Sequence, residues 1–394
     1  MHECLLIHYS EVGLKGGNRG FFEAFLRRNI ERAIAPIPVG RLRRLSGRLV
    51  LELVEQTDRA LLEERLARVP GVAYFGFARR AALQLQAIQA AALELMADPP
   101  AYHSFQVRTR RAIKSFPLTS GQINAAVGAA IQAHRGGAVD LERPETTLRI
   151  ELVDQEAYLY RQRIEGPRGL PVGTGGRVVV LLSAGIDSPV AAYRMITRGC
   201  RAILVHFHSQ PYTSKTSADN AEALAGILAR YQGPAPLYLV PLAPLQQEIV
   251  TRTPARLRIL LYRRMMLRIA AAIADREDAL ALVTGDSLGQ VSSQTLNNLA
   301  AVGAATSHLI LRPLVGSDKQ TIIREAEAIG TYPISIQPYS DCCSYLMPRQ
   351  PETAARAEEL AAAEALLGEL DLLVKNALTG SQVRRVEPLY NGEQ

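Results

Sequence analysis

Five short apolar runs in the second half of the chain constrain its fold more than any other feature of the sequence. They alternate with segments of helical pattern and lie at 178–182, 202–207, 237–240, 280–284 and 309–311. Continuous apolar runs are typical of strands buried on both faces, and their alternation with helices indicates a parallel sheet. We therefore predict a doubly wound α/β unit. Ligands of such sheets bind outside the carboxyl ends of the strands.

The first half of the chain has a different pattern. Short alternating strands and amphipathic helices follow one another twice, with Pro70-Gly71 as punctuation, which predicts two α+β units with a boundary near residue 60. Residues 166–176 are dense in glycine and proline and are predicted to be a linker. The segment 353–377 is rich in Ala, Leu and Glu and is predicted to be helical.

The basic charge is confined to the first half. Residues 1–177 hold 25 Lys and Arg against 18 Asp and Glu, whereas the remaining residues hold 20 of each. Arginine makes bidentate contacts with phosphate, so this asymmetry predicts a polyanion-binding module, most naturally for nucleic acid, joined to a second module. A solvated basic face without a ligand is the alternative. The clusters are Arg41, Arg43, Arg44 and Arg48, then Arg79 and Arg80, then Arg108, Arg110, Arg111 and Lys114.

Composition excludes several classes of protein. The chain has 394 residues, 48% of them hydrophobic and 21% charged, as in a globular protein of two or three domains. Three arginines interrupt the longest apolar stretch, 259–274, so no transmembrane helix is predicted. The first residues lack a basic leader, and we expect a cytosolic protein. Four scattered cysteines without a CxxC pair predict neither a disulfide scaffold nor a zinc site.

The first apolar run leads directly into a turn of small residues. The turn is Ser183-Ala184-Gly185-Ile186-Asp187-Ser188, and Pro189 opens a helix. Backbone N–H groups, the helix dipole and the two serine hydroxyls converge there, which predicts a phosphate cradle. Asp187 is predicted to hold Mg²⁺ against pyrophosphate. The alternative is an ordinary strand-to-helix turn with Asp187 as a cap.

This turn resembles the PP-loop, Ser-Gly-Gly-x-Asp-Ser, of the ATP pyrophosphatases, which split ATP between its α and β phosphates to adenylate an oxygen. Further motifs resemble the tRNA 4-thiouridine synthetases, the ThiI family, over essentially the whole chain. They lie at 8–18, 206–209, 284–296, 312–319 and 339–343. The resemblance implies four segments: a ferredoxin-like domain at 1–60, a THUMP domain that recognises the acceptor end of tRNA at 61–165, a linker at 166–176, and a PP-loop domain at 177–394.

The resemblance and the strand ends assign nucleotide contacts. In the loop these are Ser183, Gly185, Asp187 and Ser188. Elsewhere, we expect Leu181, Leu182, His206 and Phe207 to border adenine and ribose, with sheet core as the alternative for their side chains. Arg263 interrupts an apolar helix, where a buried charge needs a partner such as phosphate; a surface turn is the alternative.

Three residues of the later motifs complete the predicted site. Gly285 permits close backbone approach to nucleotide, and Gln294 supplies an amide. Lys319 is predicted to neutralise charge that develops on pyrophosphate, with a surface lysine at a helix start as the alternative.

Cys342 and Cys343 are the predicted nucleophile pair. A thiolate or persulfide is required to attack an adenylated carbonyl carbon, and adjacent cysteines do not readily both face one site. We predict that one is catalytic; similarity to the family favours Cys343, and which of the two carries sulfur stays open. A cluster would need a third cysteine, for which only Cys200 is left, so no iron–sulfur cluster is predicted.

Two departures from the family pattern bear on activity. Ala184 replaces a glycine and would be strained if that position required a positive φ angle. Longer family members append a rhodanese domain, whereas this sequence stops at Gln394, so we expect sulfur from a separate donor, a cysteine desulfurase, and no rhodanese-dependent thiamin role. The resemblance also implies a homodimer.

The predicted activity is an ATP-dependent tRNA sulfurtransferase. The O4 of a target uridine attacks the α phosphate of ATP, pyrophosphate leaves, and a cysteine persulfide replaces the adenylated oxygen with sulfur, releasing AMP. The alternatives are another PP-loop tRNA thiolase, such as one that makes 2-thiouridine, and a catalytically inactive tRNA-binding protein whose loop has decayed.

Overall fold

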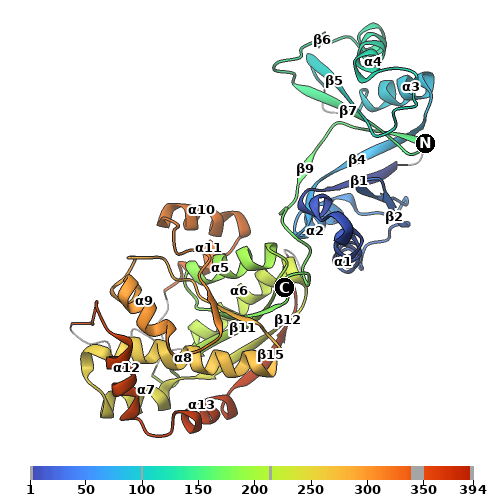
Figure 1. The fold of residues 1–394 in the computed structure, drawn as a ribbon. Coiled ribbons are helices and arrows are strands. Elements are labelled where there is room, and N and C mark those ends of the chain that lie inside the picture. The colour runs from blue at the N-terminus through green and yellow to red at the C-terminus, as the bar shows by residue number, and fades with distance from the viewer. Residues whose placement is uncertain (1–2, 99–100, 213–214, 339–349, 391–394) are drawn as a thin grey trace. The chain divides into compact units, whose positions relative to one another are not determined.

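The structure is a computed structural model of the chain, and it describes residues 3–98, 101–212, 215–338 and 350–390. Two compact units are present, Met1–Pro171 and Val172–Gln394 (Figure 1). The division falls inside the predicted linker. Each unit is described by itself below.

The first unit alternates strands and helices, as its sequence pattern predicts. Its helices and strands are β1 (Glu3–Tyr9), α1 (Arg19–Ala33), β2 (Leu42–Leu45), β3 (Arg48–Glu52), α2 (Arg59–Leu66), β4 (Val72–Ala82), α3 (Leu85–Leu95), β5 (Ser104–Arg111), α4 (Ser120–Arg135), β6 (Ala138–Val139), β7 (Thr146–Val153), β8 (Glu156–Tyr160) and β9 (Ile164–Glu165).

One sheet runs through this unit in the order β2-β3-β1-β4-β8-β7-β5-β6, with β9 paired to β4. The long strand β4 pairs with β1 up to Arg79 and with β8 from Arg79 onward, so it joins the two halves. Leu62 and Leu66 of α2 are fully buried in the same core as β1 and α1. Packing therefore places α2 with the first half, beyond the boundary predicted near residue 60.

The predicted linker is held by backbone hydrogen bonds near both of its ends. The N–H of Gly71 donates to the carbonyl of Arg168 at 2.7 Å, and the N–H of Arg168 donates to the carbonyl of Val72 at 2.8 Å. In the second unit, the N–H groups of Gly173 and Gly175 both donate to the carbonyl of Gly199. The segment makes neither a helix nor a ladder of its own, as its glycine and proline content predicts.

The second unit alternates strands and helices. Its elements are β10 (Arg177–Leu181), α5 (Asp187–Thr197), β11 (Arg201–His208), α6 (Thr216–Gln232), β12 (Ala235–Pro241), α7 (Ala243–Arg252), α8 (Arg258–Arg276), β13 (Ala281–Val283), the 3-10 turn η4 (Ser292–Gln294), α9 (Leu296–Gly303), β14 (Leu309–Leu311), α10 (Lys319–Ile329), α11 (Tyr332–Ser335), α12 (Ala357–Ala365), α13 (Leu370–Thr379) and β15 (Gln382–Val386).

The sheet order is β14-β13-β10-β11-β12-β15, and the first five strands are parallel. Successive strand residues face opposite sides. Val179 packs in a core with α8, whereas its neighbours Val178 and Val180 pack in a second core with α5. Helices therefore cover both faces (Figure 1), and the predicted doubly wound parallel sheet is confirmed.

Two features of the second unit differ from the sequence prediction. The segment predicted as helical over 353–377 is two helices, α12 and α13, because the chain turns at Gly368, where φ is +85°. Residues 353 and 354 are not helical, since their N–H groups bond to the Glu352 carboxylate. The edge strand β15 was not predicted and pairs antiparallel with β12. Its exposed, arginine-bearing sequence carries little strand signal.

Candidate active site

The turn between β10 and α5 is pinned by its two serines. The backbone N–H of Ser183 donates to Oγ of Ser188 at 2.8 Å, and that hydroxyl donates back to the Ser183 carbonyl at 3.1 Å. The N–H of Gly185 donates to Oγ of Ser183 at 3.3 Å. Both hydroxyls therefore fix the loop itself, and the loop lies at the carboxyl end of a central parallel strand, where ligands of such sheets bind.

Ala184 takes the loop position of a glycine without strain. Among the described residues, positive φ angles outside glycine occur at Asp154, Arg168 and Asp278 only. Ala184 therefore has a backbone conformation ordinary for an L-residue, and its methyl group is fully buried. The strain considered from the sequence does not arise, which removes the main argument for a decayed loop.

Gly285 lies directly against the loop. A Cβ atom at this position would be 2.8 Å from the backbone N of Ser188 and 3.0 Å from the carbonyl carbon of Asp187. These neighbours are backbone atoms and cannot rotate away. Gly285 was predicted to allow approach to nucleotide; the observed close approach is that of the PP-loop itself, which lets β13 and the loop pack together.

Asp187 is held between two donors from separate segments. Nζ of Lys319, the first residue of α10, donates to Oδ1 at 2.7 Å, and Nε2 of Gln290 donates to Oδ2 at 3.0 Å. The pair is partly exposed, with 40% of the Lys319 side chain and 21% of the Asp187 side chain accessible. Lys319 is therefore at the loop rather than at a remote surface, and solvent or ligand can reach the pair. Gln290 was not predicted.

Arg263 and Gln294 meet at a buried acid that the sequence reading did not single out. Both side chains donate to Oδ1 of Asp286, Gln294 at 3.4 Å. Asp286 is 4% exposed and directly follows Gly285. Asp286 lies in the motif at 284–296, just after a buried strand, and this position could have identified it from the sequence.

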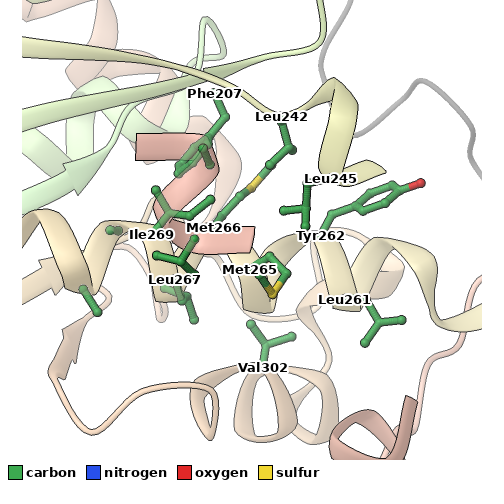
Figure 2. Packing of buried hydrophobic residues seen from close by; sticks show 14 of the residues in the cluster. Phe207, Leu242, Leu245, Leu261, Tyr262, Met265, Met266, Leu267, Ile269 and Val302 are labelled. Carbon is green, nitrogen blue, oxygen red and sulfur yellow. The ribbon is translucent and has the colours of Figure 1, made fainter. Parts of the chain in front are cut away.

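The four residues at the ends of β10 and β11 have structural side chains. Nδ1 of His206 is 2.9 Å from the carbonyl of Leu182, and its Nε2 is 3.1 Å from Oγ of Ser217. Phe207 points into the core beside Leu242 and Met266 (Figure 2). Leu182 is buried and Leu181 packs on the same core as Phe207. A nucleotide contact at these residues is thus left to their backbone, as the core alternative anticipated.

Contacts made by two further side chains join α5 and its loop to α10 and α11. Arg194 of α5 pairs with Glu325 at 2.9 Å and donates to the carbonyl of Pro313 at 2.8 Å. Oγ of Ser335 donates to the carbonyl of Gly185 at 3.3 Å. These residues were not predicted, because single polar residues on helices carry no sequence signal of their own.

Cys342 and Cys343 lie outside the described residues. The two cysteines that the structure describes are buried, and burial raises the pKa of the Cys4 thiol to about 12 and raises that of Cys200. Both are therefore protonated at neutral pH and unsuited to act as nucleophiles. In the described parts of the chain, no three His, Cys, Asp or Glu side chains are placed to hold a metal ion.

The first unit carries a basic pocket of about 340 Å³. Arg108 and Arg110 of β5 and Arg149 of β7 line it, and Tyr74 and Tyr160 supply aromatic surface. No carboxylate pairs with Arg108 or Arg110 among the residues with described side chains. Elsewhere the predicted basic clusters are partly neutralised: Arg43 pairs with Glu52, Arg79 with Asp98, and Arg80 with Glu156. Glu151 also lines the pocket and pairs with the buried Arg48, so Arg108 and Arg110 are its two exposed arginines without a carboxylate partner among the described residues.

The second unit has a PP-loop at the carboxyl end of a parallel strand, with Asp187 and Lys319 paired beside it. These features are those of the PP-loop class of ATP pyrophosphatases. The chain joins this unit to a basic α+β unit. Family models agree with this class. Residues 173–368 match the model described as thiamine biosynthesis protein (ThiI), residues 4–76 match the ThiI ferredoxin-like domain, and residues 83–161 match the THUMP domain.

Known proteins resemble the chain along its length. A probable tRNA sulfurtransferase of Moorella thermoacetica is 42% identical over 98% of this chain and 99% of its own, and one of Thermus thermophilus is 43% identical over 95% and 92%. The crystal structure of a 4-thiouridine synthetase–RNA complex with bound ATP superposes with a TM-score of 0.89, at 34% identity, over 98% of this chain and all of that one. The chain belongs to the ThiI family. In the described parts of the chain, none of the helices has the length and apolar character needed to span a membrane.

Proposed function

We propose that this chain is an ATP-dependent tRNA sulfurtransferase that forms 4-thiouridine. The observation that carries the proposal is the pairing of Asp187 with Lys319 beside an unstrained PP-loop at the carboxyl end of β10. Relatives more than 40% identical bear the name tRNA sulfurtransferase, and the 4-thiouridine synthetase of the same fold binds RNA and ATP.

The first step is adenylation of the uridine. The uridine O4 attacks the α phosphate of ATP, the bond between the α and β phosphates breaks, and pyrophosphate leaves. We propose that backbone N–H groups at the start of α5 donate to the phosphates. Lys319 is placed to neutralise the charge that develops on the leaving pyrophosphate. Leu181, Leu182, His206 and Phe207 contribute backbone near the nucleoside, and Arg263, Gly285 and Gln294 complete the proposed nucleotide contacts.

The residues present fit magnesium bound together with ATP. Mg²⁺ is commonly held by one or two carboxylates and by substrate phosphates, with water in its remaining positions. Asp187 supplies one accessible carboxylate beside the loop, where its oxygens now accept from Lys319 and Gln290. When bound there, the ion would add positive charge next to the phosphates.

The second step replaces the adenylated oxygen. The terminal sulfur of a cysteine persulfide attacks C4 of the uridine and AMP leaves, so the base is joined to the cysteine through the S–S bond. A thiol then attacks the cysteine sulfur, forms a mixed disulfide with it and releases 4-thiouridine. Because Cys4 and Cys200 are buried and protonated, we assign the persulfide to Cys342 or Cys343. We further propose a separate cysteine desulfurase as the sulfur donor.

The RNA substrate is proposed to bind the first unit. Arg108, Arg110 and Arg149 give the pocket the charge that attracts phosphate, and Tyr74 and Tyr160 offer faces for a base. The N-terminal half carries the whole basic excess of the chain. We also propose that two copies act as a homodimer and, since tRNA is the substrate, that they work in the cytoplasm.

A reconstituted reaction tests this function. Purified protein is incubated with unmodified tRNA, ATP, Mg²⁺, a cysteine desulfurase, cysteine and a thiol reductant, and the digested tRNA is analysed by mass spectrometry. We expect 4-thiouridine. Absence of any thiolated nucleoside would contradict the proposal, and 2-thiouridine in its place would identify the other thiolation.

The persulfide carrier is identified by comparing two variants. Cys342→Ser and Cys343→Ser are assayed for both pyrophosphate release and thiolation. The carrier is the cysteine whose replacement abolishes thiolation and leaves pyrophosphate release intact. If neither replacement reduces thiolation, the cysteine pair is not the nucleophile.

A further inference from the structure

Asp286 is a buried acid of the second unit whose carboxylate accepts from four side chains. Its carboxylate accepts from Oγ1 of Thr284 at 2.7 Å, from Nε of Arg312 at 3.3 Å, from Nε2 of Gln294 at 3.4 Å, and from Nη2 of Arg263. We refer to these five residues as the Asp286 cluster. With 4% of Asp286 exposed, water cannot solvate the carboxylate, so these donors determine where it lies.

The four donors come from four separate segments of the chain. Thr284 directly follows β13, Arg263 lies in the second turn of α8, Gln294 ends η4, and Arg312 follows β14. Between Thr284 and Asp286 lies Gly285, whose backbone packs on the PP-loop. One side chain therefore fixes both proposed nucleotide contacts, Arg263 and Gln294, relative to the loop.

The guanidinium of Arg263 is held in a defined plane. Its Nη1 donates to the carbonyl of Ser293 at 3.0 Å, while its Nη2 donates to Asp286. Only 16% of the Arg263 side chain is exposed, so the guanidinium has little freedom to reorient when ATP binds. Hydrogen bonds to Ser293 and Asp286 thus orient the Arg263 guanidinium before ATP binds. Such preorganisation lowers the free-energy barrier to the transition state.

The orientation of Gln294 is determined by the same acid. A carboxylate accepts hydrogen bonds only, so the amide of Gln294 must turn its NH₂ group to Asp286. Its carbonyl oxygen is buried and has no hydrogen-bond partner among the described residues. This carbonyl oxygen is therefore available to accept a hydrogen bond from a ligand.

Charge within the cluster favours binding of an anion. One carboxylate faces two guanidinium groups, so the ionised cluster has an excess of one positive charge. Burial acts to raise the pKa of Asp286, but attraction to Arg263, the Thr284 hydroxyl and Arg312 outweigh it and lower the pKa overall. The acid is therefore ionised at neutral pH and keeps both arginines in place.

We propose that Asp286 is a positioning residue for the adenylation step, which aims the Arg263 guanidinium and the Gln294 amide at the nucleotide held by the PP-loop. This inference rests on the proposed function. The alternative is that Asp286 only balances the buried charge of the two arginines. The two roles predict different activities for a variant that has the original net charge of the cluster but lacks the Asp286 carboxylate.

A pair of variants separates charge from geometry. Asp286→Asn removes the negative charge and leaves both guanidinium groups, so it raises the local charge. The double variant Asp286→Asn/Arg312→Gln returns the cluster to its original net charge but lacks the carboxylate. Asp371→Asn, at an exposed residue in the first turn of α13, is the matched control for the chemical change.

The assay measures kcat and KM for ATP from tRNA-dependent pyrophosphate release, with the melting temperature of each protein. For both cluster variants we expect kcat to fall tenfold or more while KM for ATP rises no more than twofold, because the positive charge that attracts ATP is retained. The double variant should melt near the wild-type temperature and still have the low kcat. The control should match the wild type.

Two results would overturn the positioning role. If the double variant recovers wild-type kcat together with stability, Asp286 only balances charge. If either cluster variant raises KM and leaves kcat unchanged, the contact serves ground-state binding and not the reacting geometry. Failure of the proposed function is distinguishable, since the wild-type protein itself would then release no pyrophosphate.

Discussion

Gly285→Ala is the smallest change that tests how the site is built. The added Cβ atom would lie 2.8 Å from N and 2.9 Å from Cα of Ser188, and 3.0 Å from the carbonyl carbon of Asp187. Ordinary contacts at such a carbon begin at 3.4 Å. All three neighbours are backbone atoms and cannot rotate away. The PP-loop and the end of β13 must therefore move apart by roughly half an ångström, as the backbone does around an overpacked side chain.

The magnitude follows from that displacement. Overpacking of this kind costs about 1–3 kcal/mol, and for a unit of this size each kcal/mol lowers the melting temperature by about 2–4 °C. A misplacement of about 1 Å at a reacting group can cost about 10²-fold in rate, so a shift of half that size should lower kcat by about tenfold. The loop carries Asp187 and Ser188, so the loss should appear in the adenylation step.

The assay is tRNA-dependent pyrophosphate release, with a thermal melt of the same sample. Gly121→Ala is the matched control, because its new methyl group enters open space in α4 of the first unit. We expect the control to retain wild-type kinetics and Gly285→Ala to lose both rate and stability. A Gly285→Ala protein with wild-type kcat and melting temperature would refute the argument that this glycine allows the loop to pack.

Three further predictions follow from single contacts. Lys319→Met should reduce the rate of pyrophosphate release by about 10²-fold or more, because the cation beside the loop carboxylate is lost; a wild-type rate would exclude its role. Glu364→Gln should lower the free energy of unfolding by about 3–5 kcal/mol in urea titrations, because it leaves Arg264 buried without its charged partner. The control Glu359→Gln, in the more exposed pair with Arg256, should cost at most about 1 kcal/mol. Burial acts to raise the pKa of Glu364, but its arginine partners outweigh burial and lower the pKa overall. The ionised Glu364 therefore stabilises the fold above its ordinary pKa of 4.5, and this stabilisation is lost as the pH falls through the lowered pKa. The Glu364→Gln variant should lack this dependence on acid. Burial and nearby arginines lower the pKa of His8 to about 3, against the attraction of the Glu151 carboxylate 3.2 Å from its Nε2. Stability should therefore fall as the pH drops below 6.5, and His8→Asn should reduce that dependence; an unchanged dependence would contradict it.

Most of the fold could be predicted from periodicity alone. The five apolar runs became the five parallel strands, because strands buried on both faces need apolar residues at every position. The exposed edge strand β15 escaped this argument, since Arg384 and Arg385 face no core and leave no apolar pattern. Likewise Gly368 turns the chain between α12 and α13 through its positive φ angle, which a run of Ala and Leu on either side conceals.

The site was predictable where a motif is contiguous. Asp187 and Lys319 were assigned from separate motifs, and the structure brings them to 2.7 Å. Asp286 was not singled out, because its importance comes from three donors that lie far apart in the sequence. The side chains of His206 and Phe207 went to core and strand contacts, a choice that depends on strand register and not on residue type.

The central claim is that the loop between β10 and α5 holds ATP so that the bond between its α and β phosphates breaks when an RNA base is present. The most direct measurement follows radiolabelled ATP through the reaction with tRNA and the sulfur donor and separates the nucleotide products. We predict one AMP and one pyrophosphate for each 4-thiouridine formed, and none without tRNA. Formation of ADP and phosphate in step with thiolation would contradict the account.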